Sequence, residues 1–536
     1  MQVPIFERVG LPVLILVFVF ALALRVVDLA GRPMHTDEAV QGMKFIQLLE
    51  GEGYVYDPSE FHGPTLYYLT LPLARIAGQR TGAELSETTL RLLPVLFSLA
   101  LIPMLALWRR IIGWQAVCWA ALFIAVSPIN IYYARYYIQE TLLVFFFFAF
   151  LTCSIRYAYS RRTAWVMAAG ISAGLMHATK ETSALMFAAL AGAVFIVYMS
   201  RPAKIRKRVK FKARDIPWRQ LIGGASAAAV VSVTLYSSFF SNIQGVADSV
   251  VTYFHFADRA TGQGHEKPWF THLQWIGWHK AGGFVWTELF LLMLASMGVM
   301  LSLDWRAICR RLLGINSGYF ESGRSCSSRA VSHPFAVSIL GGYAIVIIAV
   351  YSVIPYKTPW LMLSPMQIAA VLAGVGASRL VMLHGSMLWK VVVIVALGVG
   401  TAHLGMQAYR AAFFFAADER VPYAYSHTSP DAVRVSERIL RMAEMLEDSE
   451  RVVQVAAAEY WPLPWYLRSL ERVGYWNEMP AELFAPIIVL DPALSTVAES
   501  SLKGEYVPQM TGLRPGVFIT AWYRSDLWEH EIRKTQ

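Results

Sequence analysis

Apolar stretches of the length that crosses a bilayer recur along most of this 536-residue chain, and they restrict its fold more than any other feature. A hydrocarbon core about 30 Å thick requires roughly 20 apolar residues per helix. Only 16% of the residues are charged, whereas a soluble domain carries roughly 25%. The pattern predicts eleven membrane spans, at residues 9–30, 89–108, 114–129, 139–158, 163–178, 182–200, 219–240, 283–303, 334–354, 360–378 and 389–408.

The composition divides the chain into two parts. Residues 1–408 are expected to form an all-α polytopic membrane domain with a long first loop at 31–87, and residues 409–536 a small soluble α/β domain. In this second part, Ser429 and Pro430 suit the start of a helix that runs to about Asp448. Apolar runs at 451–458 and 486–490 predict strands, with a helix near 461–470 between them.

Lysine and arginine predict the orientation of the chain, because cytoplasmic loops carry the positive excess. Loops 109–113, 156–163, 201–219, 304–333 and 379–390 hold 21 of these residues in 74 positions. The alternate loops, 31–87, 130–138, 177–182, 241–282 and 355–360, hold only 10 in 120. The amino terminus is therefore predicted to be cytoplasmic and the carboxy-terminal domain exoplasmic.

The remaining charge and cysteine patterns exclude other classes. The basic segment 201–219 is interpreted as a loop beside anionic lipid rather than a nucleic-acid site. Cys118 and Cys153 lie in apolar spans, while Cys309 and Cys326 lie in a basic loop. No disulfide framework is implied.

The first exoplasmic loop contains adjacent carboxylates in the segment H-T-D-E-A, residues 35–39. Thr36 is predicted to cap a helix that continues to about Leu49 along the membrane interface. Asp37 and Glu38 would then lie in the first turn, where the helix dipole favours their ionised forms. An ionised carboxylate suits a general base, and an ordinary acidic first turn is the alternative.

Four further polar clusters fall on the same predicted side of the membrane. They are F-H-G-P with His62, Y-Y-A-R-Y-Y-I-Q-E with Arg135, Tyr136 and Glu140, H-A-T-K-E-T with Lys180 and Glu181, and I-P-Y-K-T-P-W with Tyr356 and Lys357. The alternatives are, in turn, a solvated histidine, an aromatic belt, a structural ion pair and a snorkelling lysine. Because the orientation comes from the opposite loops, the agreement indicates one active site on one face.

These motifs, together with W-P-L-P-W-Y-L-R at 461–468, resemble the GT-C superfamily of membrane glycosyltransferases. The chain is similar to protein O-mannosyltransferases and lipid A aminoarabinose transferases, and more narrowly to the flippase-activity-associated proteins of bacteria and archaea. The resemblance implies a polyprenyl-phosphate sugar as donor and a protein, lipid or glycan hydroxyl as acceptor. It implies transfer at the outer face of a prokaryotic cytoplasmic membrane, with inversion and no nucleic-acid partner.

The resemblance also implies roles for individual residues. Asp37 is expected to deprotonate the acceptor, with Glu38 orienting it or the sugar. Arg135, Lys180 and Lys357 are expected to neutralise the departing lipid phosphate. The other predicted substrate contacts are His35, His62, Tyr136, Glu140, Glu181 and Tyr356. No cofactor is certain, and a divalent cation stays open, with Asp37, Glu38 and Glu140 as candidate ligands, helped by His35 and His62.

Two other functions fit the same sequence. A polyprenyl-linked glycan flippase would carry ionisable residues at mid-span, whereas these clusters lie at span ends. A flippase-associated scaffold would recruit other proteins through its exoplasmic tail. Replacing Asp37 by asparagine separates the three classes, because only an enzyme would lose sugar transfer while still folding.

Overall fold

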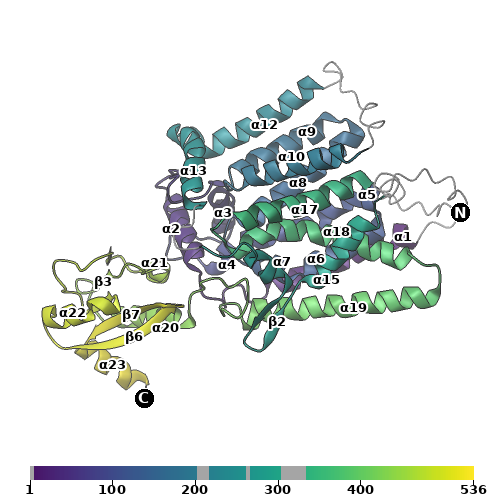
Figure 1. Cartoon of the computed structure of the whole chain (residues 1–536). Helices are drawn as coiled ribbons and strands as arrows, with labels where there is room; N and C mark the ends of the chain where they lie inside the picture. The colour runs from purple at the N-terminus through teal and green to yellow at the C-terminus, as the bar shows by residue number, and fades with distance from the viewer. Residues whose placement is uncertain (1–4, 202–216, 261–265, 304–333, 536) are drawn as a thin grey trace, which may run out of the picture.

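Helices dominate the computed structural model, which describes residues 5–201, 217–260, 266–303 and 334–535 (Figure 1). Each of the eleven predicted apolar stretches contains a helix. These helices are α1 (Ile5–Val26), α4 (Glu87–Met104), α6 (Trp114–Val126), α8 (Glu140–Ser160), α9 (Thr163–His177), α10 (Ser183–Met199), α12 (Trp218–Tyr236), α15 (Leu289–Met300), α17 (Pro334–Val353), α18 (Leu363–Met382) and α19 (Met387–Tyr409).

Fewer than eleven of these helices are long and apolar enough to qualify as membrane spans. Within the described ranges, six helices are long and apolar enough to span a bilayer, and a seventh span arises if α6 and α7 (Pro128–Ala134) are counted together. This pair bends by 61° at Ser127, where the carboxylate of Glu288 accepts hydrogen bonds from the Ser127 hydroxyl and the Ile129 N–H. The total of eleven crossings therefore stays a prediction.

Short helices continue or join the long ones. The run after α4 continues through η1 (Leu105–Trp108) and α5 (Arg109–Ile112), η3 (Pro359–Met362) precedes α18, and a π-helical turn, η4 (Arg410–Phe414), follows α19. The helical part of the chain thus extends a few residues past the boundary predicted at 408.

Several loop helices gather at one end of the long helices, as Figure 1 shows for α2 (Thr36–Glu50), α3 (Thr65–Ile76) and α13 (Gln244–Ala260). The same connections contain α14 (Thr271–Gly277) and a hairpin of β1 (His279–Ala281) and β2 (Phe284–Trp286). The carboxy-terminal sheet lies at the end that carries α2, and the start of α1 lies toward the other end (Figure 1).

A five-stranded sheet in the order β4-β3-β5-β7-β6 forms the centre of the carboxy-terminal part. Its strands are β3 (Val453–Ala456), β4 (Val473–Trp476), β5 (Ile487–Leu490), β6 (Tyr506–Arg514) and β7 (Val517–Arg524). The accompanying helices are α20 (Pro430–Glu444), α21 (Leu463–Tyr466), η5 (Pro492–Leu494), α22 (Ser495–Ser501) and α23 (Ser525–Thr535). Strand β3 runs parallel to β4 and β5, whereas β7 is antiparallel to β5 and β6.

The sequence predicts part of this sheet correctly. Both apolar runs are strands, fully buried as β3 and β5, and Ser429 caps α20 by accepting a hydrogen bond from the Asp431 N–H. Strands β4, β6 and β7 were not predicted. Strand β6 is hard to recognise because Pro508 interrupts it, and the sheet tolerates this proline because β6 lies at an edge.

Some predictions concern segments outside the described residues. These segments are 202–216 of the basic loop 201–219 and the whole loop 304–333 with Cys309 and Cys326. Cys118 and Cys153 are buried free thiols in α6 and α8.

Candidate active site

The first turn of α2 carries both predicted acidic residues, but its cap differs from the prediction. The helix starts at Thr36, and the N-cap is His35, whose Nδ1 accepts a hydrogen bond from the Asp37 N–H at 3.0 Å. The Glu38 carboxylate accepts the His35 N–H in return at 3.1 Å, which completes a capping box. Thr36 was predicted as the cap and is instead the first helical residue.

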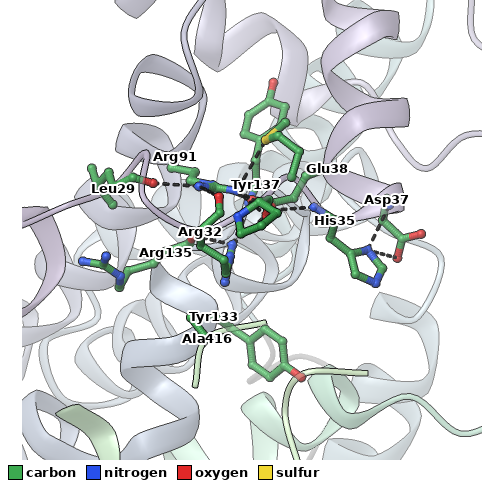
Figure 2. A network of polar contacts seen from close by, with 12 residues as sticks. Leu29, Arg32, His35, Asp37, Glu38, Arg91, Tyr133, Arg135, Tyr137 and Ala416 are labelled. Atoms are coloured by element: carbon green, nitrogen blue, oxygen red, sulfur yellow. Dashed lines mark hydrogen bonds and ion pairs between the residues drawn. The ribbon is translucent and has the colours of Figure 1, made fainter. Parts of the chain in front are cut away.

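Glu38 is completely buried between two arginines (Figure 2). One of its oxygens accepts from Arg91 Nε at 2.9 Å and the other from Arg91 Nη2 at 2.8 Å. Arg32 Nη2 lies 3.1 Å from both oxygens, and the Tyr137 N–H donates at 2.8 Å. We call Glu38, Arg32 and Arg91 the arginine-carboxylate cluster.

The electrostatics of this cluster keep Glu38 ionised. Burial by itself raises the pKa of Glu38, but the positive charges of Arg32 and Arg91 outweigh burial and hold that pKa far below its usual range. Every lone-pair direction of the carboxylate is used by a donor, so Glu38 has no oxygen left for a sugar. The cluster joins the first loop to α4 and to the turn before α8, which indicates a structural role.

Asp37 has the opposite environment. Its side chain is 43% exposed, and its Oδ2 lies 3.9 Å from His35 Nδ1. Within the described ranges, no residue donates a hydrogen bond to its carboxylate oxygens. Asp37 lines a cavity of about 230 Å³, whose walls include Gln41, Glu60, His62, Ile138, Gln139, Glu140, Phe256, Lys180, Thr182, Tyr351, Tyr356, Thr358 and Trp360. Each of the five predicted polar clusters contributes at least one of these residues.

Close backbone packing brings two of the clusters together. A Cβ added to Gly63 would lie 2.2 Å from the carbonyl oxygen of Ala178, so only glycine allows this approach. Thr65 donates to the same carbonyl through its N–H at 3.1 Å and its hydroxyl at 2.7 Å. As a result His62 Nδ1 lies 2.8 Å from Glu181 Oε2.

This contact explains the state of Glu181. Burial raises the pKa of Glu181, but the charge of His62 and its hydrogen bond lower it to about 2. Glu181 itself does not line the cavity, whereas His62 does. The glutamate therefore orients the histidine rather than contacting a ligand.

Lys180 and Glu140 form a buried ion pair in the cavity wall. Lys180 comes from the turn before α10, and Glu140 is the first residue of α8. Only one carboxylate oxygen of Glu140 is used, because Oε2 is buried without a partner among the described residues. A lysine has three N–H donors, so Lys180 retains donor capacity beyond its contact with Glu140.

Arg135, predicted to contact phosphate, does not line the cavity. Its guanidinium donates to the carbonyl oxygens of Arg25, Val27 and Asp28 at 3.2, 2.5 and 2.6 Å. Figure 2 shows it on the far side of the arginine-carboxylate cluster from Asp37. Arg25 lies in the last turn of α1 and Val27 and Asp28 directly follow the helix, where a cation is favourable.

Lys357, also predicted to contact phosphate, lies outside the cavity lining as well. Its ammonium group is completely buried and donates to the carbonyl oxygens of Tyr351, Ser352 and Ile354 at 3.2, 2.8 and 2.6 Å. These are the last carbonyls of α17, so Lys357 acts as a cap at a negative helix end. The neighbouring Tyr356 does line the cavity.

Two further predicted residues, Tyr136 and His35, lie next to the cavity lining without being part of it. Tyr136 places its ring 4.6 Å from the guanidinium of Arg32. His35 Nε2 lies 2.9 Å from the carbonyl oxygen of Tyr425, and burial lowers the pKa of His35. A neutral ring with Nε2–H donating and Nδ1 accepting satisfies both contacts. In all, the cavity includes Asp37, His62, Glu140, Lys180 and Tyr356, and excludes His35, Glu38, Arg135, Tyr136, Glu181 and Lys357.

The metal candidates do not converge. Among the described residues, no three histidine, cysteine or acidic side chains are grouped closely enough to hold an ion. The carboxylate of Glu38 is hydrogen-bonded to its two arginines, while Asp37 and Glu140 line the cavity.

The sequence analysis did not single out several residues that line the cavity. Gln41, Glu60 and Gln139 line the cavity, and each stands within a few residues of a predicted cluster. Arg91 also carried a signal, because an arginine inside an apolar span is costly unless it is paired.

Comparisons with known proteins agree on the fold. A family model described as dolichyl-phosphate-mannose-protein mannosyltransferase matches residues 62–243. ArnT from Cupriavidus metallidurans, in a crystal structure bound to undecaprenyl phosphate, is similar with a TM-score of 0.59 and 14% identity, over 96% of this chain and 98% of that one. No curated protein matches the chain.

A second structural match is the archaeal oligosaccharyltransferase AglB from Archaeoglobus fulgidus, in complex with an inhibitory peptide and a dolichol-phosphate. It aligns with a TM-score of 0.55 and 12% identity, over 92% of this chain and 71% of that one. At these identities the likeness establishes the fold, while the chemistry has to be argued from the residues of this chain.

Proposed function

We propose that the chain is a membrane glycosyltransferase of the GT-C type, which transfers a sugar from a polyprenyl-phosphate carrier to an acceptor hydroxyl. A mannosyltransferase family model that matches residues 62–243 and the likeness of the fold to ArnT support this proposal. The observation that carries the proposal is the cavity in which exposed Asp37 is combined with the ion pair of Lys180 and Glu140. A base and a cation in one cavity suit displacement at an anomeric carbon.

Asp37 is the base in this scheme. Its carboxylate takes the proton of the acceptor hydroxyl while that oxygen forms a bond to the anomeric carbon. The bond from the anomeric carbon to the phosphate oxygen breaks, and its electron pair leaves with the polyprenyl phosphate. A single displacement of this kind inverts the anomeric configuration. The exposure of the Asp37 side chain supports the assignment, because the base has to be reached by the acceptor.

Lys180 stabilises the leaving phosphate. Negative charge grows on that phosphate as the glycosidic bond breaks, and a positioned cation in a site shielded from water lowers the barrier. Arg135, Lys180 and Lys357 were predicted to share this part, and of the three Lys180 lines the cavity. Glu140 and His62 line the same cavity and would supply polar groups for the hydroxyl groups of the donor sugar.

The proposed site lies on the non-cytoplasmic face of a prokaryotic cytoplasmic membrane. The distribution of lysine and arginine supports this orientation, and α1 starts toward the end of the bundle opposite α2 (Figure 1). A lipid-linked donor cannot leave the bilayer, so its reacting carbon has to meet the acceptor near the headgroups. In this arrangement eleven spans place the carboxy-terminal domain on the exoplasmic side.

Purified protein in lipid vesicles, incubated with labelled polyprenyl-phosphate sugars, tests the proposal. We expect label to pass to an acceptor glycan, lipid or protein. Asp37→Asn should lower the rate by about 10²- to 10⁴-fold without loss of folded protein. The absence of transfer from every donor, together with movement of the lipid between leaflets, would replace the proposal by a flippase function.

A further inference from the structure

The carboxy-terminal part contacts the α2 helix through the segment Trp461–Arg468, which the proposed chemistry does not use. The Tyr466 hydroxyl accepts a hydrogen bond from the Met34 N–H at 2.7 Å. The ring of Trp465 packs on Gly42, where an added Cβ would lie 2.7 Å from it. Arg468 donates to the carbonyls of Gly82 and Leu85 at 2.9 and 2.6 Å. The carboxy-terminal part therefore packs closely on the loop that carries Asp37.

Arg514 makes the contact nearest to Asp37. It is the last residue of β6, and its Nη1 donates a hydrogen bond to the hydroxyl oxygen of Thr36 at 3.0 Å. The same nitrogen donates to the Trp461 carbonyl at 3.1 Å, and Nη2 pairs with Glu459. The side chain is only 12% exposed, so its geometry is restricted.

The strand geometry directs Arg514 toward this position. The pairing of β6 with β7 shifts in register between Gly512 and Arg514. A bulge of this kind re-aims a side chain and is common beside active sites. The charge of Asp37 also acts on Arg514: burial lowers the pKa of Arg514, and the Asp37 carboxylate opposes that effect.

We propose that Arg514 is a positioning residue, which holds Thr36 through its hydroxyl and thereby fixes the direction of the adjacent Asp37 carboxylate. This inference rests on the proposed role of Asp37 as the base. Arg514 does not line the cavity, so it acts on the position of the base and not on donor binding. The carboxy-terminal domain is thus part of the catalytic site rather than an independent module.

Steady-state kinetics of Arg514→Gln and Arg514→Lys test this role. A base displaced by about 1 Å costs up to 10²-fold in rate. We expect Arg514→Gln to lower kcat by about 10- to 100-fold while the KM for the donor changes by less than about twofold. Arg514→Lys should recover part of the loss, because lysine keeps the charge but cannot serve Thr36, Trp461 and Glu459 together.

Arg524→Gln is the matched control, since Arg524 lies on the neighbouring strand β7 and pairs with Glu450 and Asp526. It should leave kcat unchanged. Equal losses in both variants would mean general damage to the domain and would overturn the proposal. So would an Arg514→Gln enzyme with the kcat of the wild type.

Hydrogen exchange at the first turn of α2 separates this inference from the proposed function. Arg514→Gln should speed exchange at residues 36–39, and Arg524→Gln should not. If the wild-type protein transfers no sugar but exchange changes as expected, only the proposed function fails. If the wild type is active and exchange in Arg514→Gln is unchanged, only the positioning role fails.

Discussion

Asp37 and Glu38 are neighbours in the first turn of one helix, yet their carboxylates occupy opposite kinds of environment. Glu38 is fully buried, and donors from Arg32, Arg91, His35 and Tyr137 saturate it. Asp37 is 43% exposed and faces the cavity. The contrast indicates that a carboxylate whose acceptor positions are all hydrogen-bonded stabilises the fold. A carboxylate with unused acceptor positions is available to a ligand.

The same contrast separates the three predicted phosphate-binding cations. Arg135 and Lys357 donate hydrogen bonds to carbonyl oxygens at helix ends, while Lys180 is paired with one oxygen of Glu140 beside the cavity. Their chemical type is the same, and only their partners differ. Four predictions test whether this difference in partners decides between structure and catalysis.

The largest effect is expected for Glu38→Gln. The substitution leaves two buried guanidiniums without a compensating charge, and removing one partner of such a cluster costs about 3–5 kcal/mol. We expect little folded protein, measured by size-exclusion chromatography in detergent, and a strongly lowered apparent Tm. Asp37→Asn, the matched control, should keep the wild-type profile. A stable Glu38→Gln protein that lacks transfer activity would assign Glu38 to the chemistry and remove the contrast.

The second prediction concerns Lys180. Removing one group that stabilises developing charge costs about 10²- to 10³-fold in rate. Lys180→Gln should therefore lower kcat by this factor, measured with a labelled donor. Arg135→Gln provides the comparison and should retain the kcat of its folded fraction. Equal losses of kcat in both variants would show that the cavity does not distinguish these cations.

A smaller effect is expected for Lys357→Met. The substitution leaves carbonyl oxygens at the end of α17 without their donor, and each unsatisfied buried group costs about 1–3 kcal/mol. The apparent Tm should fall while the KM for the donor stays constant. A raised KM with an unchanged Tm would return Lys357 to the phosphate site.

The smallest effect concerns pH and His35. Burial lowers the pKa of His35 from its ordinary value of 6.5, so the unfolded chain binds this proton at a higher pH than the folded protein does. The stability linked to His35 is therefore complete above about pH 6.5 and is lost as the pH falls below it, by at most about 1.4 kcal/mol per pH unit.

His35→Asn tests this linkage, because asparagine also caps helices but does not titrate. The apparent Tm of the variant, measured from pH 7.5 to 5, should decline less steeply than that of the wild type. Identical slopes would show that His35 is not the group responsible.

The sequence by itself determined where the helices form and which segments carry polar clusters. A bilayer requires about 20 apolar residues per helix, and this requirement is visible in composition alone, as the helix in each apolar stretch shows. Ser429, the N-cap of α20, likewise predicted the start of its helix from local sequence. The general fold class and the segments around the cavity were therefore predictable.

Only the tertiary structure decided which charges face that cavity. Asp37, Glu140 and Lys180 come from segments far apart in the chain, and their mutual distances depend on how the helices pack. Arg135 lies five residues before Glu140 and still binds the end of α1 instead. The local sequence gives the charge of a side chain, but long-range packing sets its hydrogen-bond partners. Those partners decide whether the charge caps a helix or faces the cavity.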